Sequence, residues 1–274
     1  MNPTRRLFLR QLGLGAGAFA FCRGSRAWAA AGLPRSTPEA EGVASAGIHA
    51  FLDAMAAAKH ELHSFMLVRH GRVVGEGWWA PYAPGLRHSM YSMSKSFTST
   101  AVGFAVAEHK LRVEDRVISF FPDDLPKNAA ERLAGMRVSD LLTMSAGTAK
   151  EPTGAVTGQE NWVRAFLGQS LAQTPGTTFL YNSAATYMCS AIVQKVTGER
   201  IVDYLRPRFF EPLGIEGATW EMCPRGINTG GWGLSVPTEA LAKFGQFYLQ
   251  KGSWNGRQLL PAQWIELATS FKIQ

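Results

Sequence analysis

The sequence predicts an α/β protein of the α+β kind, in which a helix and an antiparallel hairpin are followed by a mainly helical lobe. Three observations predict this fold class. Ser45 is expected to cap a helix with one apolar face. Two apolar runs, Ser64–Arg69 and Val73–Trp79, flank His70-Gly71-Arg72 and predict a hairpin. From Ser92 onward, the long apolar segments have mainly helical spacing.

The expected helices are bounded by residues that favour helix ends. Ser, Thr and Pro are common at N-termini, and Gly is common just after the C-terminus. The expected helices are the one from Ser45, with its apolar face at Ile48, Phe51, Leu52 and Met55; Ser92–Glu108; Asp140–Met144, capped by Ser139; Ser183–Val196, closed by Gly198; a helix capped by Thr238, running to Gln250 and closed by Gly252; and a last one from Pro261.

The hairpin bears on whether the sequence is complete. A two-stranded hairpin is marginal in water, and about three strands or a covering layer are needed for stability. No later segment of the sequence clearly supplies further long strands. We therefore expect that C-terminal strands of the sheet are missing and that the sequence is truncated after Gln274.

Composition and charge exclude some classes of function. With 46% hydrophobic and 18% charged residues among 274, the chain has the composition of a globular protein, not a disordered or fibrous one. The net charge of +7 is concentrated in the first 29 residues, which hold five arginines and no acidic residue. Without those five, 23 of the 28 basic residues remain against 21 acidic ones, or +2. No basic run with interleaved aromatic residues remains, so we expect no nucleic-acid partner.

The first 29 residues have the features of an export signal. Thr4–Arg10 resembles the twin-arginine translocation motif at nearly every position. The apolar stretch Leu12–Cys22 is too short to cross a bilayer, and Ala27-Trp28-Ala29 fits a small-x-small cleavage site. A disordered basic tail is the alternative interpretation.

This pattern predicts a domain organisation. Residues 1–29 are expected to be a twin-arginine signal peptide, residues 30–44 a linker and residues 45–274 one domain. The protein is expected to be periplasmic or secreted, with the twin-arginine translocation machinery as its partner during export. Because substrates of that pathway cross the membrane folded, an exported location does not require a disulfide. Cys189 and Cys223 are therefore expected to be buried free thiols.

The tetrad Ser92-Met93-Ser94-Lys95 carries candidate chemistry. On a helix, residues i and i+3 lie on one face about 5–6 Å apart, so Lys95 can reach the hydroxyl of Ser92. In the first turn of the helix, unpaired N–H groups and the positive end of the helix dipole favour a developing anion. The alternative is a serine cap on a helix with a solvated lysine. S-x-x-K alone is a weak signal, because chance produces such spacings often.

A serine nucleophile needs a base, and Tyr181 is the better candidate. Holding a phenolate at pH 7 costs about 4 kcal/mol from a reference pKa of about 10, and a neighbouring ammonium such as Lys95 lowers that cost. The six histidines accompany no G-x-S-x-G elbow, and His60-Glu61-Leu62-His63 lacks the H-E-x-x-H zinc spacing. A tyrosine that caps or packs before the helix from Ser183 is the alternative.

Four segments together resemble the serine β-lactamase-related family, which includes class C β-lactamases, D-amino-acid peptidases, esterases and amidases. They are Ser92–Phe97, Pro175–Tyr181, Asp140–Gly147 and Gly231–Ser235. The resemblance covers residues 35 to 274. It implies a fold like that of DD-peptidases and β-lactamases, in which helices flank an antiparallel sheet beside a mainly helical lobe.

The resemblance also implies roles for individual residues. Ser92 corresponds to the acylated nucleophile, Lys95 to the proton-shuttling cation, and Tyr181 to the general base and later acid. Ser183 occupies the third place of the family's Y-x-N motif, where Asn usually contacts substrate; a hydroxyl has a shorter reach and no amide donor pair. No cofactor or metal is implied.

One expected part is missing from the sequence. The family uses a K-T-G-like or H-x-G-like triad on a C-terminal strand for the second oxyanion N–H, and no such triad follows Tyr181. Within the given sequence, Gly230-Gly231-Trp232-Gly233 is the first place to look for that donor.

These observations predict an exported serine hydrolase that acts through an acyl-enzyme on a small-molecule or peptide substrate. Esters, amides, β-lactams and D-peptide ends remain open, as does the oligomeric state. The rival hypothesis is a catalytically silent, penicillin-binding-like relative that binds peptidoglycan fragments or a partner.

Overall fold

The computed structural model describes residues 32–127 and 133–273. The described residues form two compact units that divide after Leu86, and each is considered by itself. The predicted signal peptide, residues 1–29, lies outside the described residues.

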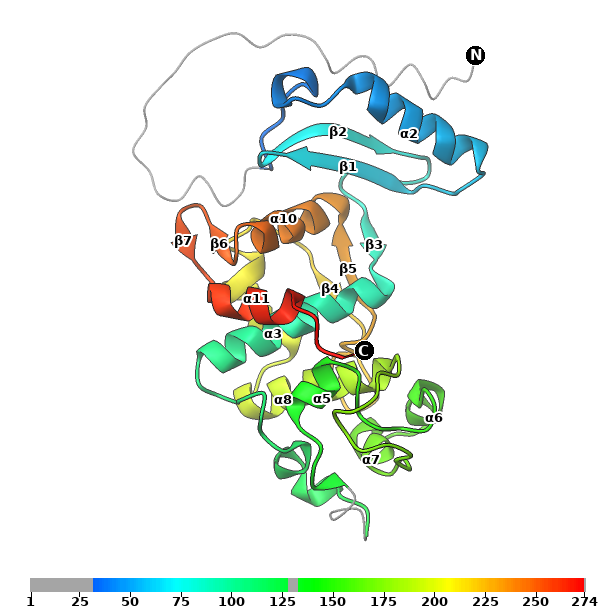
Figure 1. Ribbon diagram of the computed structural model, residues 1–274, viewed down its shortest axis with the longest axis vertical. Coiled ribbons are helices and arrows are strands. Elements are labelled where there is room, and N and C mark those ends of the chain that lie inside the picture. The colour runs from blue at the N-terminus through cyan, green and yellow to red at the C-terminus, as the bar shows by residue number, and fades with distance from the viewer. Residues whose placement is uncertain (1–31, 128–132, 274) are drawn as a thin grey trace. The chain divides into compact units, whose positions relative to one another are not determined.

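The first unit contains the predicted hairpin. Strands β1 (Ser64–Arg69) and β2 (Arg72–Trp78) pair antiparallel, as Figure 1 shows. The turn between them is His70-Gly71, and both residues have positive φ, at 50° and 75°. Such turns match the right-handed twist of paired strands, which explains the tight connection. The predicted strand positions are confirmed to within one residue.

A helix and an N-terminal segment complete this unit. Helix α2 (Ser45–Ala57) buries Ile48, and its Phe51 ring lies 5.5 Å from that of Phe65 on β1. Upstream, Val73 donates its N–H to Pro34 O at 2.8 Å and accepts from Ser36 N at 3.0 Å. The segment predicted as a linker therefore contributes backbone hydrogen bonds along β2, and it also contains a short 3-10 turn, η1 (Glu39–Glu41).

The second unit holds a small sheet that the sequence did not predict. Strands β3 (Arg87–Ser89), β5 (Leu234–Pro237) and β4 (Thr219–Trp220) pair antiparallel in the order β3-β5-β4. A second pair, β6 (Ser253–Trp254) with β7 (Arg257–Gln258), forms a short hairpin.

Helices make up most of the second unit. The helical elements are η2 (Tyr91–Met93), α3 (Ser94–Ala107), η3 (Val117–Phe120), η4 (Pro122–Asp124), α5 (Val138–Leu142), α6 (Thr153–Thr157), α7 (Trp162–Leu167), α8 (Ser183–Thr197), α9 (Ile201–Leu205), the π-helical turn η5 (Arg206–Phe210), α10 (Thr238–Leu249) and α11 (Ala262–Thr269). Helices α3 and α8 pack against each other at the centre of the core, and both are almost wholly buried in their middle turns. This agrees with the predicted mainly helical lobe.

The predicted ends of the helices are partly right. Gly198 closes α8 with φ 76°, as expected. The predicted N-caps are one or two residues off: Ser45 and Thr238 are the first helical residues after Ala44 and Pro237, which bear no side-chain cap. Ser139 lies inside α5, whose start is fixed instead by Asp140, which accepts a hydrogen bond from Arg137 N at 2.8 Å.

The two cysteines outside the predicted signal are free and buried, as predicted. Burial raises the pKa of the Cys189 thiol to about 12. The Cys223 sulfur lies 3.4 Å from the hydroxyl of Tyr187. Both thiols therefore behave as core side chains.

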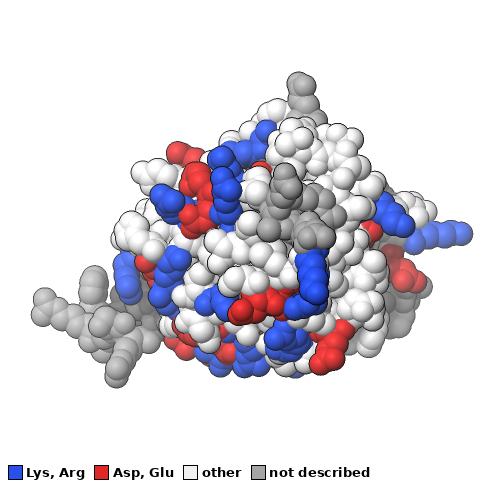
Figure 2. Space-filling model, turned by 90° about the horizontal axis from the view of Figure 1, so that it is seen from below, with Lys and Arg blue, Asp and Glu red and all other residues white. Residues whose placement is uncertain are grey.

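Charges of both signs are interspersed over the surface. Figure 2 shows Lys and Arg alternating with Asp and Glu on one face, and ion pairs such as Arg208–Glu108 (2.5 Å) neutralise many of them. Among the described residues, no helix has the length and apolar character needed to cross a membrane.

Two helix glycines give a matched test of the packing of α3. A methyl group at Gly103 would lie 2.4 Å from Nε1 of Trp264, whereas one at Gly245 in α10 would meet no atom within 4 Å. Gly103→Ala should therefore destabilise the fold by about 1–3 kcal/mol through overpacking. Gly245→Ala should stabilise it by about 0.5–1 kcal/mol through helix propensity. Denaturant unfolding measures both, and a stabilised Gly103→Ala protein would contradict the packing of α3 on α11.

Candidate active site

The site begins where β5 meets the segment that leads into α3. Strand β3 pairs with β5, and the pairing continues past the strand because Met90 N donates to Leu234 O at 2.8 Å. Leu234 N then donates to Oγ of the fully buried Ser94 at 3.2 Å. The turn Tyr91–Met93 is thus held at both ends by one residue of β5, and it presents Ser92.

The backbone of this turn is strained. Tyr91 has φ 43°, in the left-handed region that residues other than glycine rarely adopt, and its side chain is 75% exposed. Such conformations persist where the surroundings fix them, and they concentrate at functional sites. The two hydrogen bonds to Leu234 on either side of the turn provide that constraint here.

Ser92 and Lys95 are brought together as their spacing predicts. Lys95 Nζ donates to Ser92 Oγ at 3.1 Å and to the main-chain oxygen of Gly231 at 2.7 Å. Ser92 is exposed, whereas Ser94 is buried and bonded to Leu234. Of the two serines in the tetrad, only Ser92 offers its hydroxyl to a substrate.

Tyr181 completes the cluster. Its hydroxyl donates to Ser92 Oγ at 2.6 Å, and Lys95 Nζ lies 4.9 Å from the centroid of its ring. The Lys95 ammonium, followed by the Ser92 hydroxyl, lowers the pKa of Tyr181 below its ordinary value, while burial opposes the shift. The phenolate form is therefore more accessible than in a free tyrosine.

The position of Tyr181 is fixed by the residues around it. Leu180 N donates to Met144 O at 2.9 Å. Asn182 is 1% exposed and caps α8, because its side-chain oxygen accepts from Ala185 N at 2.8 Å. The start of α8 at Ser183 was predicted correctly, but its cap, Asn182, was not predicted. An asparagine directly before a helical apolar run was the available signal.

Ser183, the predicted substrate-binding residue, lies beside this cluster. Its hydroxyl contributes to the lowered pKa of Tyr181. Its N–H donates to Oε1 of Glu151 at 3.1 Å, and Glu151 also accepts from Thr153 N at 3.0 Å. No sequence pattern pointed to Glu151, because the contact depends on a loop that returns to the start of α8.

The glycine-rich loop Gly230–Gly233, the first place to look for the oxyanion donor, lies against the cluster. A methyl group at Gly231 would lie 2.7 Å from Ser183 O, so only glycine fits there. Gly231 N already donates to Thr229 O at 2.6 Å, while the oxygens of Gly230 and Gly231 accept from Thr98 Oγ1 and Lys95 Nζ. The loop therefore presents two main-chain acceptors to the site, and the N–H of Gly231 is bonded within the loop.

The cluster contains a hydroxyl, a phenol and an ammonium in mutual contact. Such a set can transfer a proton away from Ser92 Oγ and return it, which is the requirement for nucleophilic catalysis by serine. Within residues 32–127 and 133–273, no group of three or more His, Cys, Asp or Glu side chains could hold a metal ion.

Known proteins with similar sequences support this interpretation of the fold. The family described as Beta-lactamase matches residues 26–271. The chain is 25% identical over 224 residues to the 6-aminohexanoate-dimer hydrolase of Paenarthrobacter ureafaciens, covering 74% of this chain and 56% of that protein. It is 23% identical over 200 residues to a beta-lactamase of Escherichia coli (strain K12), covering 65% of this chain and 52% of that protein. The chain thus spans little more than half the length of these two relatives.

A solved structure has a similar fold. A penicillin-binding protein homologue from Caulobacter crescentus superposes with a TM-score of 0.66 at 18% identity, covering 82% of this chain and 74% of that one. The predicted resemblance and the predicted fold class are both confirmed.

The lowered pKa of Tyr181 can be tested directly. Lys95→Met removes the ammonium that is the largest cause of the shift, so the pKa of Tyr181 should rise toward about 10. The measurement is a pH titration of phenolate absorbance, taken as the difference between each protein and its Tyr181→Phe counterpart. Lys195→Met, on the exposed side of α8, is the control and should leave the titration unchanged. A midpoint in Lys95→Met at or below that of the unmodified protein would refute the coupling.

Proposed function

The chain belongs to the beta-lactamase family, and we propose that it is an exported serine hydrolase that forms an acyl-enzyme on an ester, amide or β-lactam carbonyl. One observation carries the proposal: the exposed Ser92 Oγ lies 2.6 Å from the Tyr181 hydroxyl and 3.1 Å from Lys95 Nζ. This arrangement supports attack by Ser92, because a phenol whose pKa is lowered by a neighbouring cation lies within hydrogen-bond reach of its hydroxyl.

Acylation follows from these contacts. Ser92 Oγ attacks the substrate carbonyl carbon while its proton passes to the phenolate oxygen of Tyr181. The resulting tetrahedral oxyanion collapses, the bond to the leaving group breaks, and Tyr181 returns the proton to the departing alcohol or amine. The Lys95 ammonium stabilises the phenolate before attack.

Deacylation uses the same groups in the reverse order. Water attacks the acyl carbon and gives a proton to Tyr181, the bond to Ser92 Oγ breaks, and Tyr181 returns the proton to the serine. The products are the carboxylic acid and the free enzyme. No oxidant, reductant or further reactant is needed.

The names of the relatives indicate the range of substrates to test. One is a 6-aminohexanoate-dimer hydrolase and another is a beta-lactamase, so linear amides and β-lactams are the first candidates. Ser183 stands where the family's motif usually has Asn, and a hydroxyl has no amide donor pair, which disfavours substrates that need an amide partner at this position.

Export is part of the proposal and rests on the leader sequence. Thr4–Arg10 with its two adjacent arginines, the short apolar stretch and the Ala27-Trp28-Ala29 site support transport by the twin-arginine pathway to the periplasm or beyond.

A catalytically silent binding protein is the second candidate, favoured by the hydroxyl of Ser183 in place of the amide of the Y-x-N motif. A silent relative would bind peptidoglycan fragments or a partner, or would take up an acyl group once without releasing it. Turnover numbers well above one per Ser92 exclude this alternative.

The identity of the nucleophile is tested by covalent labelling. A fluorophosphonate or a penicillin probe should label the natural gene product on Ser92, because that hydroxyl is exposed and bonded to Tyr181. Ser92→Ala should abolish labelling. Ser94→Ala should leave Ser92 as the labelled residue, although it removes a hydrogen bond to Leu234. Mass-spectrometric localisation of the label to Ser94 would show that the assignment is wrong.

The role of the phenol is tested by Tyr181→Phe. This change keeps the ring and removes only the oxygen that contacts Ser92, so kcat should fall by about 10²–10⁴. Hydrolysis of a nitrophenyl ester or nitrocefin measures it. Activity within about threefold of the unmodified protein would eliminate Tyr181 as the base.

A further inference from the structure

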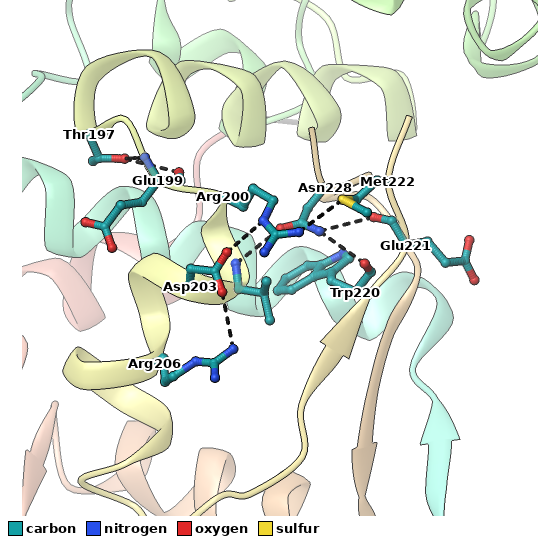
Figure 3. A network of polar contacts seen from close by, with 10 residues as sticks. Thr197, Glu199, Arg200, Asp203, Arg206, Trp220, Glu221, Met222 and Asn228 are labelled. Carbon is teal, nitrogen blue, oxygen red and sulfur yellow. Dashed lines mark hydrogen bonds and ion pairs between the residues drawn. The ribbon is translucent and has the colours of Figure 1, made fainter. Parts of the chain in front are cut away.

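A buried asparagine lies behind the glycine-rich loop. Asn228 is 1% exposed and lies between β4 and β5. Its amide nitrogen donates to Trp220 O at 3.1 Å and Glu221 O at 3.4 Å, and its amide oxygen accepts from Val202 N at 3.3 Å. Figure 3 shows the side chain between the start of α9 and the end of β4. It therefore joins two elements through one amide group.

The main chain of Asn228 is also fixed. Its carbonyl oxygen accepts from Ser190 Oγ, on α8, at 2.7 Å. Beside it, Arg200 forms an ion pair with Asp203 at 2.7 Å, which Figure 3 shows as part of the same polar network. Helices α8 and α9 and strand β4 thus all determine where the chain leaves residue 228.

From residue 228 the chain has little freedom before it reaches the site. Thr229 N donates to Glu221 O at 2.9 Å, and Thr229 Oγ1 donates to Trp232 O at 2.5 Å. A methyl group at Gly230 would lie 2.9 Å from Thr186 O, so the loop is pressed against α8. The next residue, Gly231, presents the oxygen that accepts from Lys95 Nζ at 2.7 Å.

We propose that Asn228 is a positioning residue, which holds the Gly230–Gly231 carbonyls against α3 and thereby keeps the Lys95 ammonium beside Tyr181 and Ser92. It touches none of the reacting atoms. This role concerns the same site as the proposed function. Only its kinetic test, the pH profile of kcat/KM, rests on that function.

The expected consequence is electrostatic. Two charged groups lie near Tyr181: Lys95 from α3, over its ring, and Glu151 from the loop before α6, bonded to the N–H of Ser183. When the loop shifts, Lys95 loses its main-chain acceptor and moves from Tyr181, while Glu151 is unaffected. The pKa of Tyr181 then rises, and activity that depends on the phenolate moves to higher pH.

Two variants test the proposal. Asn228→Ala removes all three side-chain hydrogen bonds. Thr98→Val is milder and nearly isosteric, and it removes only the hydroxyl that donates to Gly230 O at 2.8 Å. Asn161→Ala is the control, because the amide that it deletes bonds to Arg164 N at the start of α7 and to Asp124, not to the loop.

In both test variants, the acid limb of the pH profile of kcat/KM should shift to higher pH by about 0.5–1 unit. At pH 7 this corresponds to about three- to tenfold lower activity. The loss should diminish at higher pH. The phenolate titration of Tyr181, taken by difference against Tyr181→Phe in each background, should move by the same amount. Asn161→Ala should lower the melting temperature without moving either curve.

The outcomes separate this proposal from the proposed function. An unchanged titration in both Asn228→Ala and Thr98→Val, or a loss of activity by the same factor at every pH, overturns the positioning role. If the unmodified protein has no Ser92-dependent turnover, the proposed function fails, and the absorbance titration still decides the role of Asn228. If Asn228→Ala does not fold, Thr98→Val decides it.

Discussion

The arrangement of the site depends on the two main-chain hydrogen bonds of Leu234. Its oxygen accepts from Met90 N and its N–H donates to Ser94 Oγ, so one residue holds both ends of the turn that presents Ser92. The residues joined are 144 and 140 positions apart. Since Leu234 also begins β5 directly after the glycine-rich loop, the same contact brings the Gly231 oxygen to Lys95. Neither the exposed serine nor its cation would have a defined place without this pairing.

The packing of α3 on α8 positions Tyr181, the third residue of the cluster with Ser92 and Lys95. Tyr181 precedes α8, and its hydroxyl reaches Ser92 although the two are 89 positions apart. Both helices are buried over most of their length, and hydrophobic burial of this kind is the main stabilising contribution to a fold. The polar contacts of the site are therefore held on a rigid apolar support, which keeps the distances among the three groups short without a metal ion or disulfide among the described residues.

Local sequence patterns correctly predicted the features that depend on residues close in sequence. The hairpin of β1 and β2 followed from two apolar runs around a glycine turn, and the contact of Ser92 with Lys95 followed from helical spacing. The strands β3, β4 and β5 were missed because each has only two to four residues, too few for a periodic pattern. Glu151 was missed for a related reason, since its contact with Ser183 joins a loop to a helix start 32 positions away. The acceptor role of the Gly231 oxygen was not predicted, because the direction of the backbone within a glycine loop cannot be derived from composition.

The acceptor that holds Lys95 belongs to the main chain, and this has an evolutionary consequence. A side-chain partner can be lost in a single codon change, but every amino acid carries the same carbonyl group. The anchor of the cation is thus inherited with the path of the backbone, not with the identity of any residue. Among substitutions in this loop, those that alter the path of the backbone should be the inactivating ones, above all substitutions at the crowded Gly230 and Gly231. Substitutions of the side-chain partners of Lys95 would leave this main-chain acceptor in place.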